Sequence, residues 1–379
     1  MLKVLVFYDY FDPAFKAGGP IRSLVNLVRL MEDEIDFSII TSNTDHDNTV
    51  LPVKKLNRWI PYGKKSQVAY LDKEHRNQRF IDQLLEDVAV HMVYINGVFS
   101  LFTTILPLRL SKKRGIPVII APRGMLQVTS LSIRPLKKKV YMWVLKNWML
   151  HDSIIWHVTT KQEADDFNEL FPRYGNQLYL TGNVPFFLKQ MPASAHKNRQ
   201  KRVLGTVAVI SPMKNIHLVI EALGKQRKSV RYEIYGPVKD ESYWNECRGL
   251  IDRLPDNVEV IFQGTVRPEM VYKVMQRFDF YIQPSKSENF GHSIFEAFNL
   301  GIPVITSDRT PWKGLNVKKA GWDVSLTDPQ SLISSIGEAM NLSDSEYMSY
   351  SHGARKVAED YMEVSKLREK YLELFGCAS

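Results

Sequence analysis

Short apolar runs alternate with longer helical patterns along almost the whole chain, and this alternation constrains the fold more than any other feature. The predicted strands are 3–8, 37–41, 92–95, 118–121 and 154–158 in the first half, and 203–209, 232–235, 258–262, 278–283 and 304–306 in the second. Strands that alternate with helices form a parallel sheet covered by helices on both faces. The sequence therefore predicts an α/β protein with two doubly wound, Rossmann-like units.

A segment of different composition separates the two sets of strands. Residues 188–202 contain Pro192, small residues and several basic side chains without an acid, which is typical of a solvated linker. We therefore expect one domain over 1–187 and a second over 203–356. The chain of 379 residues is long enough for both domains to bury a core. The last helical pattern, around 363–375, follows the second domain.

The composition is that of a fully folded protein, with 44% hydrophobic residues. No apolar run approaches the roughly 18 to 20 residues that a membrane span needs. The first eight residues resemble a strand rather than a secretion signal, so a cytoplasmic location is expected. Cys247 and Cys377 are too few and too far apart for a disulfide framework or a zinc site.

The net charge of +9 favours anionic partners without distinguishing phosphates, nucleic acids and lipid head groups. Part of the charge is concentrated in one segment, which is basic, free of acids and interleaved with Tyr141, Met142, Trp143 and Trp148; its cations are Arg134, Lys137, Lys138, Lys139 and Lys146. This pattern is typical of a helix that lies on an anionic membrane surface. A helix packed on the core with a solvated basic face explains it equally well.

Two carboxylates, Glu288 and Glu296, stand eight residues apart where an apolar strand leads into an apolar-periodic helix. We expect Glu288 in the loop and Glu296 inside the helix. If the helix begins near Gly291, its free N–H groups face the same space as Glu288 and suit a phosphate group. The alternative is an ordinary strand, loop and helix with two surface glutamates.

The wider segment from Gln283 to Gly291, followed by Glu296-Ala297 and 301–305, closely resembles the donor-binding segment of retaining glycosyltransferases of family 4. That family has a Glu-x7-Glu motif and the GT-B fold, in which two Rossmann-like domains face a central cleft. Weaker family-like features lie along nearly the whole chain, at Gly18-Gly19-Pro20, 122–126, 234–237 and Pro311-Trp312. The resemblance also implies that the helix over 357–379 crosses back onto the first domain.

The resemblance implies a role for each residue of this segment. Glu288 would bind hydroxyls of the donor sugar, and Glu296 would bind the ribose of the nucleotide. The remaining predicted donor contacts are Asn289, Phe290, Gly291, His292 and Ser293. His292 would contact a phosphate or hydroxyl, although a histidine that only caps the helix is nearly as good an explanation.

Lys214 matches the family's phosphate-binding lysine, and a lysine there can neutralise a diphosphate leaving group. The family usually has an arginine five residues earlier, where this chain has Val209. The second charge would then come from another residue, or the chain would be a degenerate transferase that serves as a scaffold.

Gly18 and Gly19 follow the first predicted strand and precede a helix that has Pro20 near its start. Paired glycines allow a backbone to approach a phosphate closely, with Arg22 as a further contact, whereas the alternative is a plain turn. Arg123 stands near the point where similar proteins place a histidine. An arginine cannot act as a base at neutral pH, so we expect electrostatic stabilisation or acceptor binding, with a structural salt bridge as the alternative.

The resemblance is to a metal-independent family, so no metal or other cofactor is expected. The Asp45-His46-Asp47 triplet in a polar loop could bind manganese, but this assignment is the weaker one. Motifs of P-loop ATPases, zinc peptidases and serine hydrolases are absent from the sequence.

These features together predict a retaining glycosyltransferase that moves a sugar from a nucleotide diphosphate to a glycan acceptor. The donor would lie in the cleft between the domains. The expected acceptor is a lipid-linked oligosaccharide for a bacterial surface polysaccharide or lipopolysaccharide, at the inner face of the membrane, and nucleic acid is not an expected partner. The alternatives are a nucleotide-sugar epimerase of the same fold and the non-enzymatic scaffold.

Overall fold

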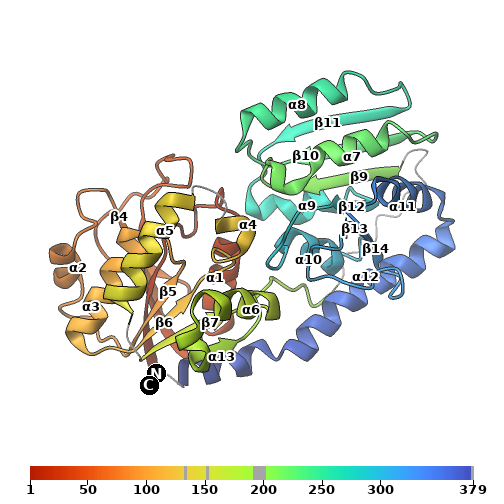
Figure 1. The fold of residues 1–379 in the computed structure, drawn as a ribbon. Helices are drawn as coiled ribbons and strands as arrows, with labels where there is room; N and C mark the ends of the chain where they lie inside the picture. The colour runs from red at the N-terminus through yellow and green to blue at the C-terminus, as the bar shows by residue number, and fades with distance from the viewer. Residues whose placement is uncertain (132–134, 151–152, 191–201, 377–379) are drawn as a thin grey trace. The chain divides into compact units, whose positions relative to one another are not determined.

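A computed structural model describes residues 1–131, 135–150, 153–190 and 202–376, which form two compact units (Figure 1). Unit 1 comprises Met1–Val184 and Ser365–Ser379, and unit 2 comprises Pro185–Val364. The change of unit at Val184 falls just before the segment 188–202 that the sequence predicts as a linker. Residues 191–201 of that segment lie outside the described part of the chain.

Unit 1 contains a sheet in the order β3-β4-β2-β1-β5-β6-β7-β8. Its strands are β1 (Leu2–Phe7), β2 (Ile35–Ser42), β3 (Ile60–Tyr62), β4 (Ser66–Leu71), β5 (Met92–Asn96), β6 (Val118–Ala121), β7 (Ile154–Val158) and β8 (Leu178–Leu180). All neighbouring strands are parallel except β3 and β4. The α-helices of this unit are α1 (Gly19–Leu30), α2 (Gln78–Leu84), α3 (Leu106–Arg114), α4 (Val128–Leu131), α5 (Pro135–Val144), α6 (Lys161–Leu170) and α13 (Leu367–Gly376).

Unit 2 contains a fully parallel sheet in the order β11-β10-β9-β12-β13-β14. Its strands are β9 (Arg202–Val207), β10 (Val230–Tyr235), β11 (Val258–Gly264), β12 (Phe280–Gln283), β13 (Val304–Ser307) and β14 (Gly321–Val324). Its α-helices are α7 (Ile216–Leu223), α8 (Glu241–Ile251), α9 (Val271–Met275), α10 (His292–Asn299), α11 (Pro329–Asn341) and α12 (Asp344–Ser365).

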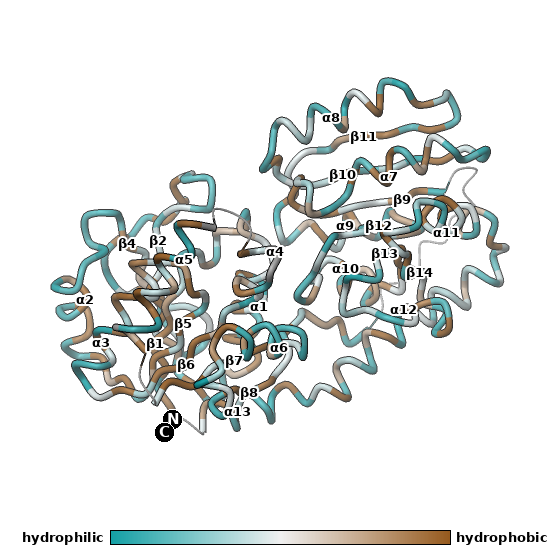
Figure 2. Tube along the Cα trace, in the orientation of Figure 1, coloured by the Kyte–Doolittle hydropathy of each residue, from teal (hydrophilic) through white to brown (hydrophobic). Residues whose placement is uncertain are grey.

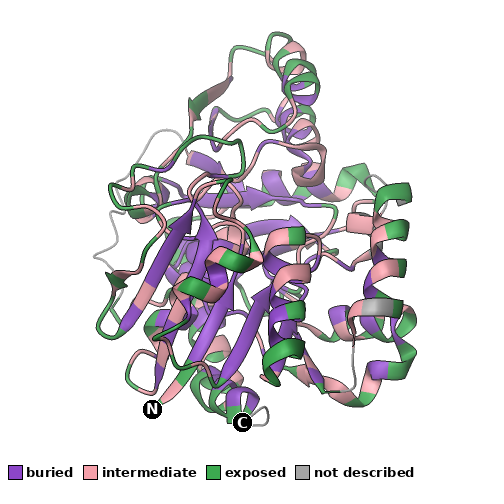
Figure 3. Cartoon of the chain, turned by 90° about the vertical axis from the view of Figure 1, so that its left-hand side faces the viewer, coloured by how far each residue is buried: buried purple, intermediate pink, exposed green. Residues whose placement is uncertain are grey.

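Helices cover both faces of each sheet, which explains the nearly continuous apolar runs of the strands. Figure 2 shows hydrophobic residues concentrated along the strands, whereas the outer helices alternate between hydrophobic and hydrophilic positions. In Figure 3 the strands of unit 1 are buried over most of their length, and the helices in front expose their outer faces. Helix α1 illustrates the pattern, because Ile21, Leu24, Leu27 and Val28 recur at helical spacing and all are buried.

The structure confirms the predicted α/β fold class and all the predicted strands, with shifts of a few residues at their ends. The prediction missed β3, β4, β8 and β14. These strands are short, lie at or near sheet edges, or carry polar residues, as in the segment SQVAYL of β4. Pairing with a neighbouring strand of the sheet stabilises them, and the short local pattern of each strand does not reveal that pairing.

The C-terminal helical pattern consists of two helices rather than one. Helix α12 ends at Ser365, Lys366 has a φ of +43°, and α13 begins at Leu367. Helix α13 belongs to unit 1: its Tyr371 hydroxyl donates to the Gly182 carbonyl over 3.1 Å, and the Tyr371 and Phe375 side chains are buried. The segment that joins unit 1 therefore begins later than the predicted residue 357.

Candidate functional site

The connections from two adjacent strands of unit 2, β9 and β12, lead in opposite directions across the sheet. The chain goes from β9 to β10 on one side, and from β12 to β13 on the other. Ligands of open α/β sheets bind outside the carboxyl ends of the strands at such a switch point. Here the two loops that meet are the turn Pro212–Lys214 and the loop from Pro284 to Gly291, joined by a hydrogen bond of 2.9 Å from the Lys286 amide to the Met213 carbonyl.

Lys214 and Glu288 form an ion pair at this point, although they are far apart in the sequence. The Lys214 ammonium donates to Glu288 Oε1, which also accepts from Gln283 Nε2 at 2.8 Å and from the Ser285 hydroxyl at 2.7 Å. The other oxygen of the carboxylate, Oε2, has no hydrogen-bond partner among the described residues. The side chains of Lys214 and Glu288 remain 21% and 12% exposed, so a ligand can reach the pair.

Gln283 orients this carboxylate from the end of β12. Its Oε1 atom lies 2.6 Å from the Tyr281 hydroxyl and accepts from the Ser293 hydroxyl at 3.1 Å, and its Nε2 donates to Glu288. Gln283 thereby links the strand, the loop and the first turn of α10. Sequence reasoning missed this positioning role for Gln283 and Ser285. The available signal was a polar side chain that ends a buried apolar strand.

Helix α10 begins directly after Gly291, as the sequence predicts, so that Glu288 lies in the loop and Glu296 in the helix. Gly291 has a φ of +78°, which a residue with a side chain rarely adopts. A Cβ atom there would also lie 3.0 Å from Ile294 Cδ1. Glu296 is buried at 4% exposure, and its predicted contact with a ribose stays a prediction.

Phe290 is fixed by aromatic neighbours on the other side of this loop. The Trp312 indole N–H donates to the Phe290 carbonyl over 2.6 Å, and the two ring centroids lie 5.3 Å apart. The ring of His292 lies 4.8 Å from that of Phe290. The aromatic contacts therefore hold the main chain next to Glu288 and the helix start, where Asn289 and Ser293 also lie. Trp312 is a further positioning residue to which sequence reasoning gave no role.

Gly236 belongs to the predicted family-like segment 234–237 and has a structural explanation. Its φ is +147°, and a Cβ atom would collide with the Ala208 backbone. The close approach brings the segment after β10 against the segment after β9, which contains Val209. Val209 is partly exposed, and its position supplies no cation at this site.

The glycine pair of unit 1 begins α1 as predicted, with Gly18 at the N-cap (φ +82°) and Gly19 and Pro20 in the first turn. Nothing lies within 4 Å of a Cβ atom built on Gly18, so the space beside it is open. Arg22 lies in the same first turn and is partly buried. A phosphate contact at these residues remains a prediction.

Arg123 is buried, with 6% exposure, and has a positive φ of 55°. Its guanidinium donates to Asn96 Oδ1 at 2.7 Å, to Asn183 Oδ1 at 2.9 Å and to the Tyr94 hydroxyl at 2.6 Å. These contacts stabilise the interior of unit 1, in agreement with the structural alternative, although the partners are neutral side chains rather than the acid of a salt bridge. A contact of Arg123 with a substrate stays a prediction.

The two carboxylates of the Asp45-His46-Asp47 triplet bind other groups of unit 1. Asp45 is buried and accepts from the amides of Phe15, at 2.9 Å, and Lys16, at 3.1 Å. Asp47 pairs with the Lys16 ammonium at 2.5 Å, and this hydrogen bond holds its pKa well below the usual range. Within the described ranges no group of three or more His, Cys, Asp or Glu side chains is arranged to hold a metal ion.

The helix of the cationic segment packs on the core of unit 1 and exposes basic side chains, as in the second of the two explanations that the sequence left open. Met142 and Leu145 belong to the core of unit 1, whereas Lys137, Lys139 and Trp143 are exposed. Lys138 donates to the Ser130 carbonyl over 2.5 Å, and Arg134 lies outside the described residues. Among the described helices, none is both long enough and apolar enough to cross a membrane.

Residues 189–357 match the protein family described as "Glycosyl transferases group 1". No curated protein matches the chain. Among solved structures, Alr3699/HepE of Anabaena, in complex with UDP and glucose, is 16% identical with a TM-score of 0.73, and the match covers 100% of both chains.

Two further structures have similar folds. WaaG, a glycosyltransferase involved in lipopolysaccharide biosynthesis, is 15% identical with a TM-score of 0.71, and the match covers 98% of this chain and 99% of that one. The sucrose-phosphate synthase tll1590 of Thermosynechococcus elongatus is 15% identical with a TM-score of 0.77, and the match covers 100% of both chains. At these identities the likeness concerns the fold, and the chain has the GT-B fold of glycosyltransferases, with two Rossmann-like domains.

Proposed function

We propose that this protein transfers a sugar from a nucleotide diphosphate donor to a glycan acceptor, with retention of the anomeric configuration. The observation that carries the proposal is the Lys214–Glu288 pair at the switch point of unit 2, next to the start of α10. The match of residues 189–357 to group 1 glycosyltransferases supports it. The UDP and glucose held by the similar Anabaena protein make a UDP-hexose the first donor to test.

Glu288 would bind hydroxyls of the donor sugar through Oε2, since Lys214, Gln283 and Ser285 all donate to Oε1. Lys214 would hold the diphosphate, whose negative charge grows as the leaving group departs, and preorganised charge of this kind stabilises a transition state strongly. The N–H groups at the start of α10 add to this field. Glu296 would bind the ribose. Because Val209 stands where the family usually has an arginine, Lys214 would offset more of the diphosphate charge.

In the proposed reaction the bond between the anomeric carbon and the phosphate oxygen breaks, and the acceptor oxygen forms its bond on the same face. The acceptor proton passes to the departing phosphate. No carboxylate nucleophile is needed, unlike in retaining glycosidases, where two carboxylates flank the bond.

The acceptor is proposed to be a lipid-linked oligosaccharide, elongated in the cytoplasm at the inner face of a membrane. The exposed lysines and Trp143 on α5 of unit 1 support this assignment. The products would be precursors of a bacterial surface polysaccharide or lipopolysaccharide.

The test is incubation of the full chain with a panel of nucleotide sugars, with and without glycan acceptors, followed by identification of the products. Release of free nucleoside diphosphate, reduced in Lys214→Ala, supports a transferase. An isomerised nucleotide sugar would instead indicate an epimerase. Neither product with any donor, together with no thermal shift by the donors, would favour the scaffold. Retention is checked from the anomeric configuration of the product.

A further inference from the structure

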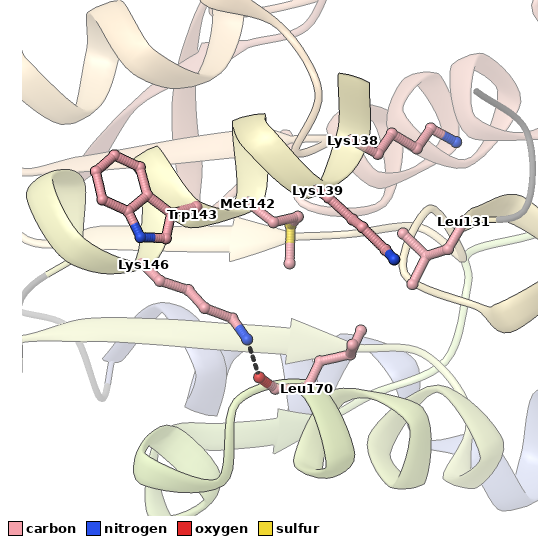
Figure 4. Close-up of a pocket in the computed structure, with 7 residues that line it drawn as sticks. All are labelled: Leu131, Lys138, Lys139, Met142, Trp143, Lys146 and Leu170. Carbon is pink, nitrogen blue, oxygen red and sulfur yellow. Dashed lines mark hydrogen bonds between the residues drawn. The ribbon is translucent and has the colours of Figure 1, made fainter. Parts of the chain in front are cut away.

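An apolar pocket of about 380 Å³ lies beside the cationic segment of unit 1 (Figure 4). Its lining comes from the end of α4, from α5 with the π-helical turn Leu145–Met149 that follows it, and from the last residue of α6. The lining residues are Leu131, Lys138, Lys139, Met142, Trp143, Lys146 and Leu170. Figure 4 shows the apolar side chains of Leu131, Met142 and Leu170 toward the pocket, with lysine stems between them.

The three lysines of the pocket differ in the hydrogen bonds and aromatic contacts that their ammonium groups make. Lys138 donates to the Ser130 carbonyl and lies 5.1 Å from the centroid of the Phe99 ring. Lys146 donates to the Leu170 carbonyl and lies 4.7 Å from the centroid of the Phe171 ring. Lys139 is exposed and has no hydrogen-bond or ion-pair partner in the described ranges. An anion at the rim would therefore meet the free ammonium of Lys139 and the ammonium of Lys146, whose partners are a carbonyl and an aromatic ring.

An exposed apolar stripe adjoins the pocket on α5. Leu136, Val140 and Trp143 are 78%, 66% and 57% exposed, and their spacing of three and four residues places them on one side of the helix. Large apolar side chains exposed together mark an interaction surface. Cations next to such a stripe are typical of a helix that lies in the boundary between lipid head groups and acyl chains.

The charge around the pocket favours a negatively charged ligand. Residues 135–149 include four cations and no acid, and none of the acids of α6 is among the lining residues of the pocket. A ligand that satisfies the site thus needs an apolar chain for the interior and a negative group for the rim. An anionic phospholipid has both.

We propose that this pocket binds one anionic membrane lipid. An acyl chain of the lipid packs against Leu131, Met142 and Leu170, and its phosphate binds Lys139 and Lys146. The exposed stripe then enters the same leaflet. This proposal specifies how the protein would contact the membrane that carries its proposed acceptor. It rests on the proposed function in that respect only, and not on the glycosyl transfer itself.

The binding test uses the full chain and dioctanoyl phosphatidylglycerol below its micellar concentration, followed by native mass spectrometry and Trp fluorescence. One lipid should bind per chain. Lys139→Ser and Lys146→Ser should each weaken binding about fivefold, since a cation near an anionic lipid contributes about 1 kcal/mol. Lys137→Ser is the matched control: the residue is exposed on the same helix, outside the lining, and its loss should leave binding of a single lipid unchanged.

Leu170→Trp separates pocket filling from surface attraction, because it fills the interior and retains every cation. This variant should lose binding of the single lipid while the melting temperature stays near that of the wild type. Equal binding of dioctanoyl phosphatidylcholine, equal binding of glycerol phosphate, or unchanged binding in Leu170→Trp would each overturn the proposal. No nucleotide sugar is present in this experiment, so its failure leaves glycosyl transfer standing, and a failed transfer assay leaves lipid binding standing.

Discussion

At the scale of single residues, the site of unit 2 depends on how one carboxylate is oriented. Glu288 Oε1 accepts from Lys214, Gln283 and Ser285, which fixes the side chain before any donor binds. Preorganisation of this kind avoids reorganisation during the reaction. Glu296 is buried in α10, so the two glutamates occupy different surroundings and should contribute to different steps.

We expect Glu288→Gln mainly to lower turnover and Glu296→Gln mainly to weaken donor binding. Loss of a charged hydrogen bond to the ribose should weaken binding by about 1 to 3 kcal/mol. Steady-state kinetics with varied donor concentration separate kcat from KM. Wild-type kinetics in both variants would contradict the assignment of the site to unit 2.

His157 gives unit 1 a dependence on pH. The ring is fully buried, its Nε2 donates to the Thr181 carbonyl at 3.0 Å, and its Nδ1 lies 2.9 Å from the Tyr94 hydroxyl. Burial, together with the charge of Arg123, holds the pKa of His157 well below its usual value of 6.5. The unfolded chain therefore binds a proton more readily than the folded chain below that pH.

The free energy of unfolding should have its full value above about pH 6.5. It should fall by up to about 1.4 kcal/mol per pH unit below that pH. Denaturant titrations across this range measure the free energy of unfolding, and His157→Gln should flatten its pH dependence. His352 is exposed on α12 and supplies the control, since the same exchange there should leave the profile unchanged. An unaltered profile in His157→Gln would refute this account.

At the scale of elements, the start of α10 depends on Gly291. A side chain at a φ of +78° costs about 1 to 2 kcal/mol, and the close approach to Ile294 adds to this. Gly249 lies inside α8 with open space around its Cβ position. The same substitution should therefore act in opposite directions at the two glycines.

We expect Gly291→Ala to lower the melting temperature and to weaken donor binding, because the first N–H groups of α10 would shift. Gly249→Ala should raise stability by about 0.5 to 1 kcal/mol, since alanine is the better helix former. Calorimetry and a donor titration check both variants. If Gly291→Ala is as stable as the wild type, the loop does not require its left-handed conformation.

At the scale of the whole molecule, the proposed chemistry offsets the diphosphate charge with protein groups rather than with a metal ion. We expect transfer to survive EDTA. Asp47→Ala, which removes an exposed ion pair with Lys16, should be mild. Asp45→Ala should instead destabilise unit 1, because the part-buried backbone amides of Phe15 and Lys16 lose their acceptor. Activity lost with EDTA and restored by manganese would refute the electrostatic assignment.

The sequence by itself determined the class of fold and the segment that contains the candidate site. The reason is local: buried parallel strands give apolar runs, amphipathic helices give periodic ones, and the residues from Gln283 to Glu296 are contiguous. The start of α10 after Gly291 followed from the same local pattern.

Only the tertiary structure decided which side chains meet. The Lys214–Glu288 pair arises because β9 and β12 are neighbours in the sheet, and the burial of Arg123 arises because Tyr94, Asn96 and Asn183 surround it. The lipid pocket likewise needs Leu170 of α6 opposite α5. Such contacts depend on chain segments far apart in the sequence, so their energies appear only when the whole unit folds and no local pattern encodes them.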